Sequence, residues 1–142
     1  VEAAAFLGGV SGNAGLFSTT QDVARIAQWW LDKGICGDRR YLSRATCELF
    51  TTLKSRDSRR GLGFDKPDTE HTDNSPCSPE APASVFGHTG FTGTCVWIDP
   101  DNELIFVFLS NRTYPSVYEP NNLVRYNIRT RMQQVMYQSI LH

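Results

Sequence analysis

The sequence lacks the features that would assign it to a metal, membrane or nucleic-acid protein. Its four cysteines include no pair at C-x-x-C spacing and none in a zinc pattern with histidine, so no metal ligand set is visible. Its longest apolar run, Leu104 to Leu109, is far shorter than the ~20 residues of a membrane helix. A formal net charge of -1 provides no attraction to nucleic acid or to an anionic membrane. We therefore expect a globular chain with no cofactor, no nucleic-acid partner and no membrane-spanning segment.

The sequence also lacks an initial methionine and a signal peptide. It begins at Val1, with no charged segment followed by an apolar one. We interpret its 142 residues as part of a longer chain and expect no domain boundary within them. The thiols of Cys36, Cys47, Cys77 and Cys95 are expected to be free and mostly buried, although a disulfide between Cys36 and Cys47 stays open.

Two helices are predicted in the first third of the chain. Thr19 or Thr20 is a suitable N-cap, and Lys33-Gly34 is typical of a helix end. Between them, apolar residues recur at helical spacing: Val23, Ile26, Ala27, Trp30 and Leu31. A shorter helix is expected after Ser43, through residues 45–50.

The middle of the chain, residues 55–84, is predicted to consist mainly of loops. Residues 55–60 contain Arg56, Arg59 and Arg60, which could bind an anion, but the absence of interleaved aromatic residues favours a solvated loop. Residues 61–64 read as a short strand. Residues 65–84 contain four of the seven prolines, and we expect an exposed loop there.

The last third predicts a hairpin and a helix. Residues 94–98 alternate with period 2, residues 99–102 form a turn, and residues 104–109 read as a strand buried on both faces. Asn121 or Asn122 would cap one long helix across the hairpin. Its apolar stripe would be Val124, Ile128, Met132, Val135, Met136 and Ile140. The fold class is thus α+β, an antiparallel sheet of about three strands packed by the C-terminal helix, with a small separate helical patch.

His88-Thr89-Gly90 is the sharpest local feature. Glycines around a His-Thr step at a strand edge expose backbone N–H groups, which an acyl-transfer enzyme needs for its oxyanion. The two side chains add donors for a substrate carbonyl or carboxylate. Taken alone, a histidine in a glycine-rich turn is more often structural.

Three segments in order carry a family resemblance. They are Gly12-Asn13-Ala14-Gly15-Leu16-Phe17-Ser18-Thr19, His88-Thr89-Gly90-Phe91-Thr92-Gly93-Thr94, and Leu109-Ser110-Asn111-Arg112 followed by Tyr114-Pro115. This order resembles the serine β-lactamase-like family, which includes class C β-lactamases, penicillin-binding proteins, esterases and peptidases. The resemblance implies that residues 1–142 are the C-terminal portion of one β-lactamase-like domain, with a proline-rich loop at about 65–84.

The resemblance also assigns site residues. His88 takes the place of the lysine in the family's Lys-Thr-Gly motif, and Thr89 that of its threonine. The backbone N–H of Phe91 becomes an oxyanion donor. Gly90, Asn111 and Arg112 lie on the substrate side. The substrate in the full-length protein would be a small ester, a peptide or a β-lactam-like molecule.

The sequence departs from the family pattern at the nucleophile. No serine here is followed by lysine three residues later, and without Ser-x-x-Lys no acyl-enzyme forms. Tyr41-Leu42-Ser43 and Tyr114-Pro115-Ser116 match the family's tyrosine motif only loosely and come too late in the chain. We therefore expect a fragment that is inactive alone. A histidine at position 88 is largely neutral at pH 7, which favours an esterase or a cell-wall peptidase over a dedicated β-lactamase.

Two other interpretations stay open from sequence. One is a non-catalytic binding or accessory module of a larger bacterial envelope protein, such as one fused to a glycoside hydrolase. The other is an unrelated α+β domain that matches by accident. For the fragment we expect a periplasmic or cell-envelope location by resemblance. We also expect self-association through the unpaired edge of the strand at 104–109.

Overall fold

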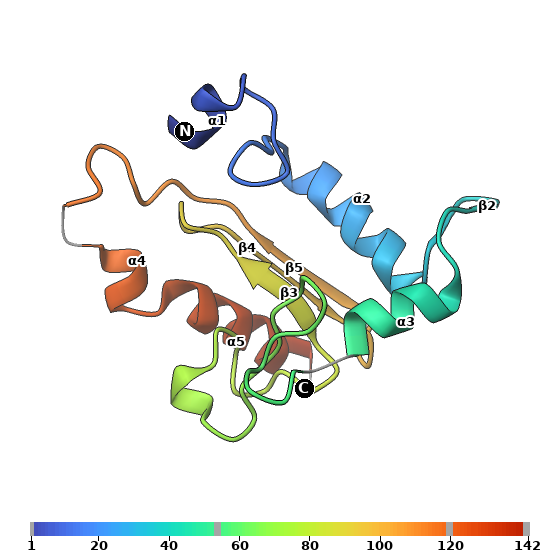
Figure 1. The fold of residues 1–142 in the computed structure, drawn as a ribbon. Helices are drawn as coiled ribbons and strands as arrows, with labels where there is room; N and C mark the ends of the chain where they lie inside the picture. Colours follow the sequence, from blue (N-terminus) through green and yellow to red (C-terminus); the bar gives the residue numbers. More distant parts are fainter. Residues whose placement is uncertain (1, 53–54, 119–120, 141–142) are drawn as a thin grey trace.

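The computed structural model describes residues 2–52, 55–118 and 121–140. The elements, drawn in Figure 1, follow in chain order: α1 (Glu2–Phe6), α2 (Thr20–Leu31), β1 (Ile35–Cys36), β2 (Arg39–Arg40), α3 (Arg44–Thr52), the 3-10 helix η1 (Thr72–Asn74), β3 (Phe86–Thr89), β4 (Cys95–Asp99), β5 (Leu104–Phe108), α4 (Asn122–Arg125) and α5 (Ile128–Ile140). None of the helices in these ranges is long and apolar enough to cross a membrane.

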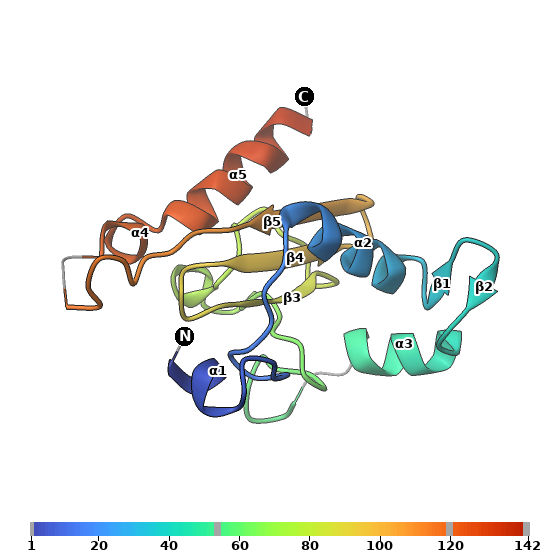
Figure 2. The ribbon, with the colours of Figure 1, turned by 90° about the horizontal axis from the view of Figure 1, so that it is seen from above.

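The main sheet has three antiparallel strands in the order β3-β4-β5, and Figure 2 shows them side by side with β4 in the middle. Trp97 of β4 pairs with Gly87 on one side and with Phe106 on the other. The predicted hairpin is confirmed. One feature of it is different: every residue of β5 is only half-buried, so this strand is not buried on both faces.

Two helices cover opposite faces of this sheet (Figure 1). On the α5 face, Trp97 and Tyr137 lie in a cluster with Cys77, Ala81, Val85 and Cys95. On the other face, Ala27 of α2 packs with Phe86 and Ile98. The α+β class is confirmed. The helical patch, however, is not separate, because the apolar face of α2 closes the second side of the sheet.

The predicted helix starts are confirmed, and the structure selects between the alternatives. Thr19 is the N-cap of α2, since its hydroxyl accepts from the Asp22 N–H at 3.2 Å. Asn121 caps α4 in the same way, accepting from the Val124 N–H at 3.3 Å. The prediction of a single long C-terminal helix was wrong. The helix is interrupted at Asn127, whose φ is 49°, and α4 and α5 are separate helices. A left-handed asparagine is a common helix terminator.

The predicted apolar stripe of the last helix was wrong in part, although Met136 does pack against the core cluster. Met132 and Val135 are about half exposed or more, whereas Gln133 and Tyr137 are buried. Gln133 accepts from the Ser78 N–H at 2.9 Å, and the Tyr137 hydroxyl donates to Asp99 at 2.7 Å. These hydrogen bonds, to Ser78 of the proline-rich segment and to Asp99 of β4, therefore determined which face of α5 is buried.

The proline-rich segment 65–84 is not simply an exposed loop. Its two ends are buried, with Asp65 and Lys66 at one and Cys77 and Ser78 near the other, while residues 69–74 are exposed. The short strand predicted at 61–64 is absent. Instead, the backbone of Asp65 pairs with Gly87 at the outer edge of β3, through N–H to carbonyl contacts of 2.7 and 3.0 Å.

All four cysteines are free thiols. Cys36 is exposed, and the other three are buried. The prediction of mostly buried free thiols is confirmed, and the disulfide between Cys36 and Cys47 does not form.

Candidate active site

The candidate site is built on the outer edge of β3 and the turn that follows it. The Gly90 N–H donates to the Thr94 carbonyl at 2.8 Å, and the Gly93 N–H donates to the Gly90 carbonyl at 3.0 Å. Gly93 has a φ of 98°, which favours glycine, and an added Cβ there would lie 2.5 Å from the Ser110 hydroxyl. These contacts close a tight turn over residues 90–93.

Phe91 occupies the second position of this turn, and its side chain is 72% exposed. Its backbone N–H has no hydrogen-bond acceptor among the described residues. Gly87 turns both its N–H and its carbonyl toward Asp65, outside the sheet. Since alternate residues of a strand repeat their orientation, the N–H of Thr89 also faces outward. The β3 edge thus presents backbone donors to whatever lies beside it.

His88 is half-buried and held at both ring nitrogens. Its Nε2 lies 2.8 Å from Nη1 of Arg60, and its Nδ1 lies 2.6 Å from the Thr89 carbonyl oxygen. A guanidinium can only donate and a carbonyl can only accept. We therefore assign the ring, from these contacts, as a neutral imidazole that carries its proton on Nδ1.

The basic segment 55–60 contributes directly to this site. Arg59 contacts the buried carboxylate of Asp65 through Nε at 2.8 Å and Nη2 at 3.0 Å, and Arg60 reaches His88. The sequence interpretation of a solvated loop was therefore wrong for these two arginines. The contact between Arg60 and His88 spans 28 positions, so no local pattern could have shown it.

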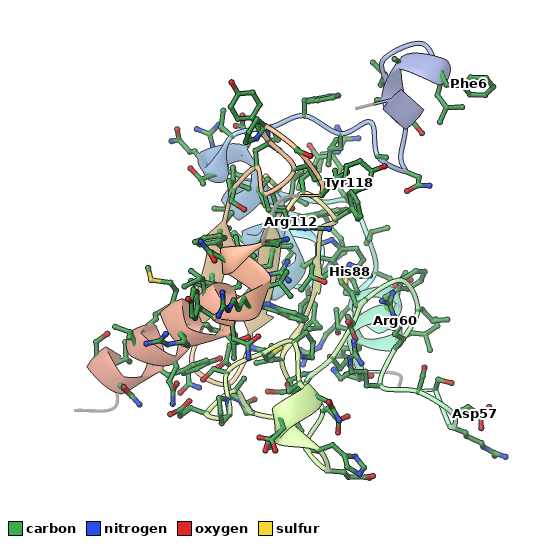
Figure 3. All side chains as sticks on the ribbon, turned by 90° about the vertical axis from the view of Figure 1, so that its left-hand side faces the viewer. Phe6, Asp57, Arg60, His88, Arg112 and Tyr118 are labelled. Atoms are coloured by element: carbon green, nitrogen blue, oxygen red, sulfur yellow. The ribbon has the colours of Figure 1, made fainter. Side chains whose placement is uncertain are left out.

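Arg112 braces the turn. Its backbone N–H donates to the Thr92 carbonyl at 2.9 Å, its Nε donates to the Phe91 carbonyl, and its guanidinium carbon lies 4.5 Å from the centre of the Phe91 ring. In Figure 3, Arg112, His88 and Arg60 follow one another along the same side of the molecule. These contacts give Arg112 a role in positioning the turn.

Asn111 is exposed, and its side-chain oxygen accepts from the Thr113 hydroxyl at 2.8 Å. It lines a shallow depression of about 550 Å³ with Arg112, Tyr114 and residues 121–123. A second cavity of about 320 Å³, between α2, α3 and the start of β3, contains none of the motif residues. No cluster of three or more potential metal ligands occurs in the described parts of the chain.

Comparison with known proteins now decides the family. The family model for beta-lactamases matches residues 1–128. The chain belongs to the beta-lactamase family. The reading as an unrelated α+β domain is thereby excluded. The three motifs that carried the resemblance all lie within the matched range.

Two curated relatives are similar to most of this chain and are longer than it. A protein from Escherichia coli strain K12, with the assigned name D-alanyl-D-alanine carboxypeptidase, is 40% identical over 118 residues, covering 80% of this chain. A protein of the same assigned name from Salmonella typhi is 37% identical over the same length. The chain spans about a quarter of the length of these relatives, 26% in each case.

A solved structure agrees with the fold. A beta-lactamase from Mycobacterium bovis superimposes with a TM-score of 0.57 at 19% identity, over 84% of this chain and 44% of that one. The mixed helix and antiparallel-sheet arrangement is thus a partial beta-lactamase fold.

Proposed function

We propose that this chain is the C-terminal part of a serine hydrolase that acts on peptides through an acyl-enzyme, and that it is inactive alone. The observation that carries the proposal is the β3 edge, where the half-buried His88 and Thr89 are followed at once by the turn with the exposed Phe91, whose N–H has no acceptor among the described residues. The assigned name of the Escherichia coli relative supports a peptide ending in D-alanyl-D-alanine as the substrate. Such a substrate belongs to the cell wall, which supports a periplasmic or envelope location.

Each site residue then has a role. As a serine oxygen attacks the substrate carbonyl, negative charge develops on the carbonyl oxygen, and the Phe91 N–H stabilises it by donating a hydrogen bond. Thr89 and His88 hold the polar end of the substrate along the strand, and Gly90 allows the backbone to turn away beside it. Asn111 forms the far wall. Arg112 keeps the Phe91 peptide in place through its contact with the Phe91 carbonyl.

The absent nucleophile accounts for the proposed inactivity of this chain. No serine in it has a lysine three positions later, so no residue here would form the acyl-enzyme. A fluorescent penicillin should label the full-length protein and not this chain. Labelling of any serine in this chain would contradict the proposal. A full-length protein that is neither labelled nor able to release D-alanine would favour the accessory-module alternative.

The oxyanion role has its own test at Phe91. The variant Phe91→Pro removes the backbone N–H, while Phe91→Ala keeps it. Proline is favoured at the second position of a turn, so the 90–93 turn should still form. In the full-length protein we expect Phe91→Pro to lower kcat for D-alanine release by about 10²–10³, and Phe91→Ala to have a much smaller effect. Equal effects of the two variants would rule out the N–H as the donor.

A further inference from the structure

The position that the family motif gives to a lysine carries no formal charge in this chain. His88 is a neutral imidazole by its contacts, and the nearest positive charge is the guanidinium of Arg60, whose Nη1 lies 2.8 Å from Nε2 of His88. The positive charge next to this site therefore comes from Arg60, which lies 28 positions before His88 and outside strand β3. That segment lies outside all three motifs.

Contacts of the neighbouring residues Asp65 and Arg59 determine where Arg60 lies. Asp65 pairs with Gly87 through the backbone, which fastens the segment to the β3 edge. The Asp65 carboxylate, 1% exposed, is engaged by Arg59 at 2.8 and 3.0 Å. Arg60 lies further away, with Nη2 at 3.9 Å from the same carboxylate, and its side chain is 54% exposed. Two guanidiniums therefore face one carboxylate, and the group with the excess positive charge is Arg60.

We propose that Arg60 is a specificity-determining residue that binds a carboxylate of the substrate at the β3 edge. This rests on the proposed function, since it concerns the substrate of the same site. A guanidinium offers five N–H donors in a planar fork, so it can keep its contact with His88 and still donate to a carboxylate. The geometry predicts a preference for anionic substrates over neutral ones of the same reactivity.

Two acylating probes with different charge test this in the full-length protein. A fluorescent penicillin carries a carboxylate, and an alkyl fluorophosphonate carries none. We expect Arg60→Gln to lower the second-order rate constant for penicillin labelling about tenfold or more, and to change that for the fluorophosphonate less than about twofold. Arg60→Lys, which keeps a positive charge, should recover part of the penicillin rate.

Arg56→Gln is the matched control, because Arg56 lies in the same segment, is exposed and forms no hydrogen bond or ion pair with the other described residues. It should change neither rate. The proposal is overturned if Arg60→Gln slows both probes equally, which would indicate a general role in positioning His88, or if it slows neither. A wild-type protein that neither probe labels would instead overturn the proposed function, and this inference with it.

Discussion

Asp65 takes part both in the fold and in the candidate site. Its backbone pairs with Gly87, its carboxylate binds Arg59, and it thereby sets where Arg60 meets His88. A buried carboxylate is stable only while it stays paired and hydrogen-bonded. Asp65 meets this condition with Arg59 and with the Lys66 N–H at 3.0 Å.

Breaking this pair should therefore be costly. We expect Asp65→Asn to lower the free energy of unfolding by about 3 kcal/mol, because the half-buried Arg59 loses its counter-charge and the buried position loses an ion pair. Denaturant titration followed by circular dichroism measures the change. Asp57→Asn is the control, since the exposed Asp57 forms no ion pair within the described residues, and it should change stability by less than about 0.5 kcal/mol. A similar loss in both variants would contradict the role given to Asp65.

His88 should matter more for turnover than for stability. It is half-buried and makes two polar contacts, of which one is with an exposed arginine. In the full-length protein we expect His88→Ala to lower kcat/KM for a peptide or ester substrate about tenfold, the value of one lost hydrogen bond to substrate. The melting temperature should fall by only a few degrees. Unchanged activity with a large fall in melting temperature would identify His88 as a structural residue.

At the scale of elements, α5 is held to the sheet by polar as well as apolar contacts. Tyr137 lies 1% exposed against Trp97, and its hydroxyl donates to the Asp99 carboxylate. Burial and this hydrogen bond both raise the pKa of Tyr137. Burial beneath the same helix raises the pKa of the Cys95 thiol to about 11 from its ordinary 9.0. Protonated forms of both groups are therefore favoured by the folded state.

This coupling predicts a loss of stability at alkaline pH. The folded chain holds the Cys95 proton up to about pH 11, whereas the unfolded chain releases it near pH 9. The stabilisation is thus fully present below pH 9 and is lost as the pH rises toward 11. We expect Cys95 to account for a decrease of roughly 2 kcal/mol in the free energy of unfolding over this range. Cys95→Ala should flatten the decline, and the exposed-thiol control Cys36→Ala should not.

At the scale of the whole molecule, β5 is an edge strand with no pairing partner on its outer side among the described residues. Helix α2 packs against one face of the sheet and contacts β5. An unpaired, apolar strand edge is a template for another chain. Self-association through it remains a prediction.

The prediction is tested by size measurement at several concentrations. We expect this chain to form dimers or larger assemblies, and Val107→Lys, which places a charge on the edge strand, to shift it toward monomer. Circular dichroism of the variant confirms that it is folded. A clean monomer of the original chain at high concentration would contradict the edge as an interface.

The sequence by itself determined the elements that depend on neighbours along the chain. Thr19 and Asn121 cap helices because their side chains bond backbone groups three residues on, and the 95–108 hairpin follows from alternation and a proline turn. The ordered motifs then sufficed for the family, which the comparison confirmed. Its site assignments, His88, Thr89 and Phe91 among them, remain proposals.

Only the tertiary structure decided what depends on distant partners. Periodicity placed Met132 and Val135 in the core, but hydrogen bonds to Ser78 and Asp99 turned Gln133 and Tyr137 inward instead. Composition predicted solvated loops at 55–60 and 65–84. In the structure an ion pair joins Arg59 to Asp65, and a backbone bridge joins Asp65 to Gly87 of β3. Pairing residues that are distant in the chain costs conformational entropy, which burial with a polar partner offsets. Neither effect produces a periodic pattern in the sequence, so sequence analysis does not detect these pairs.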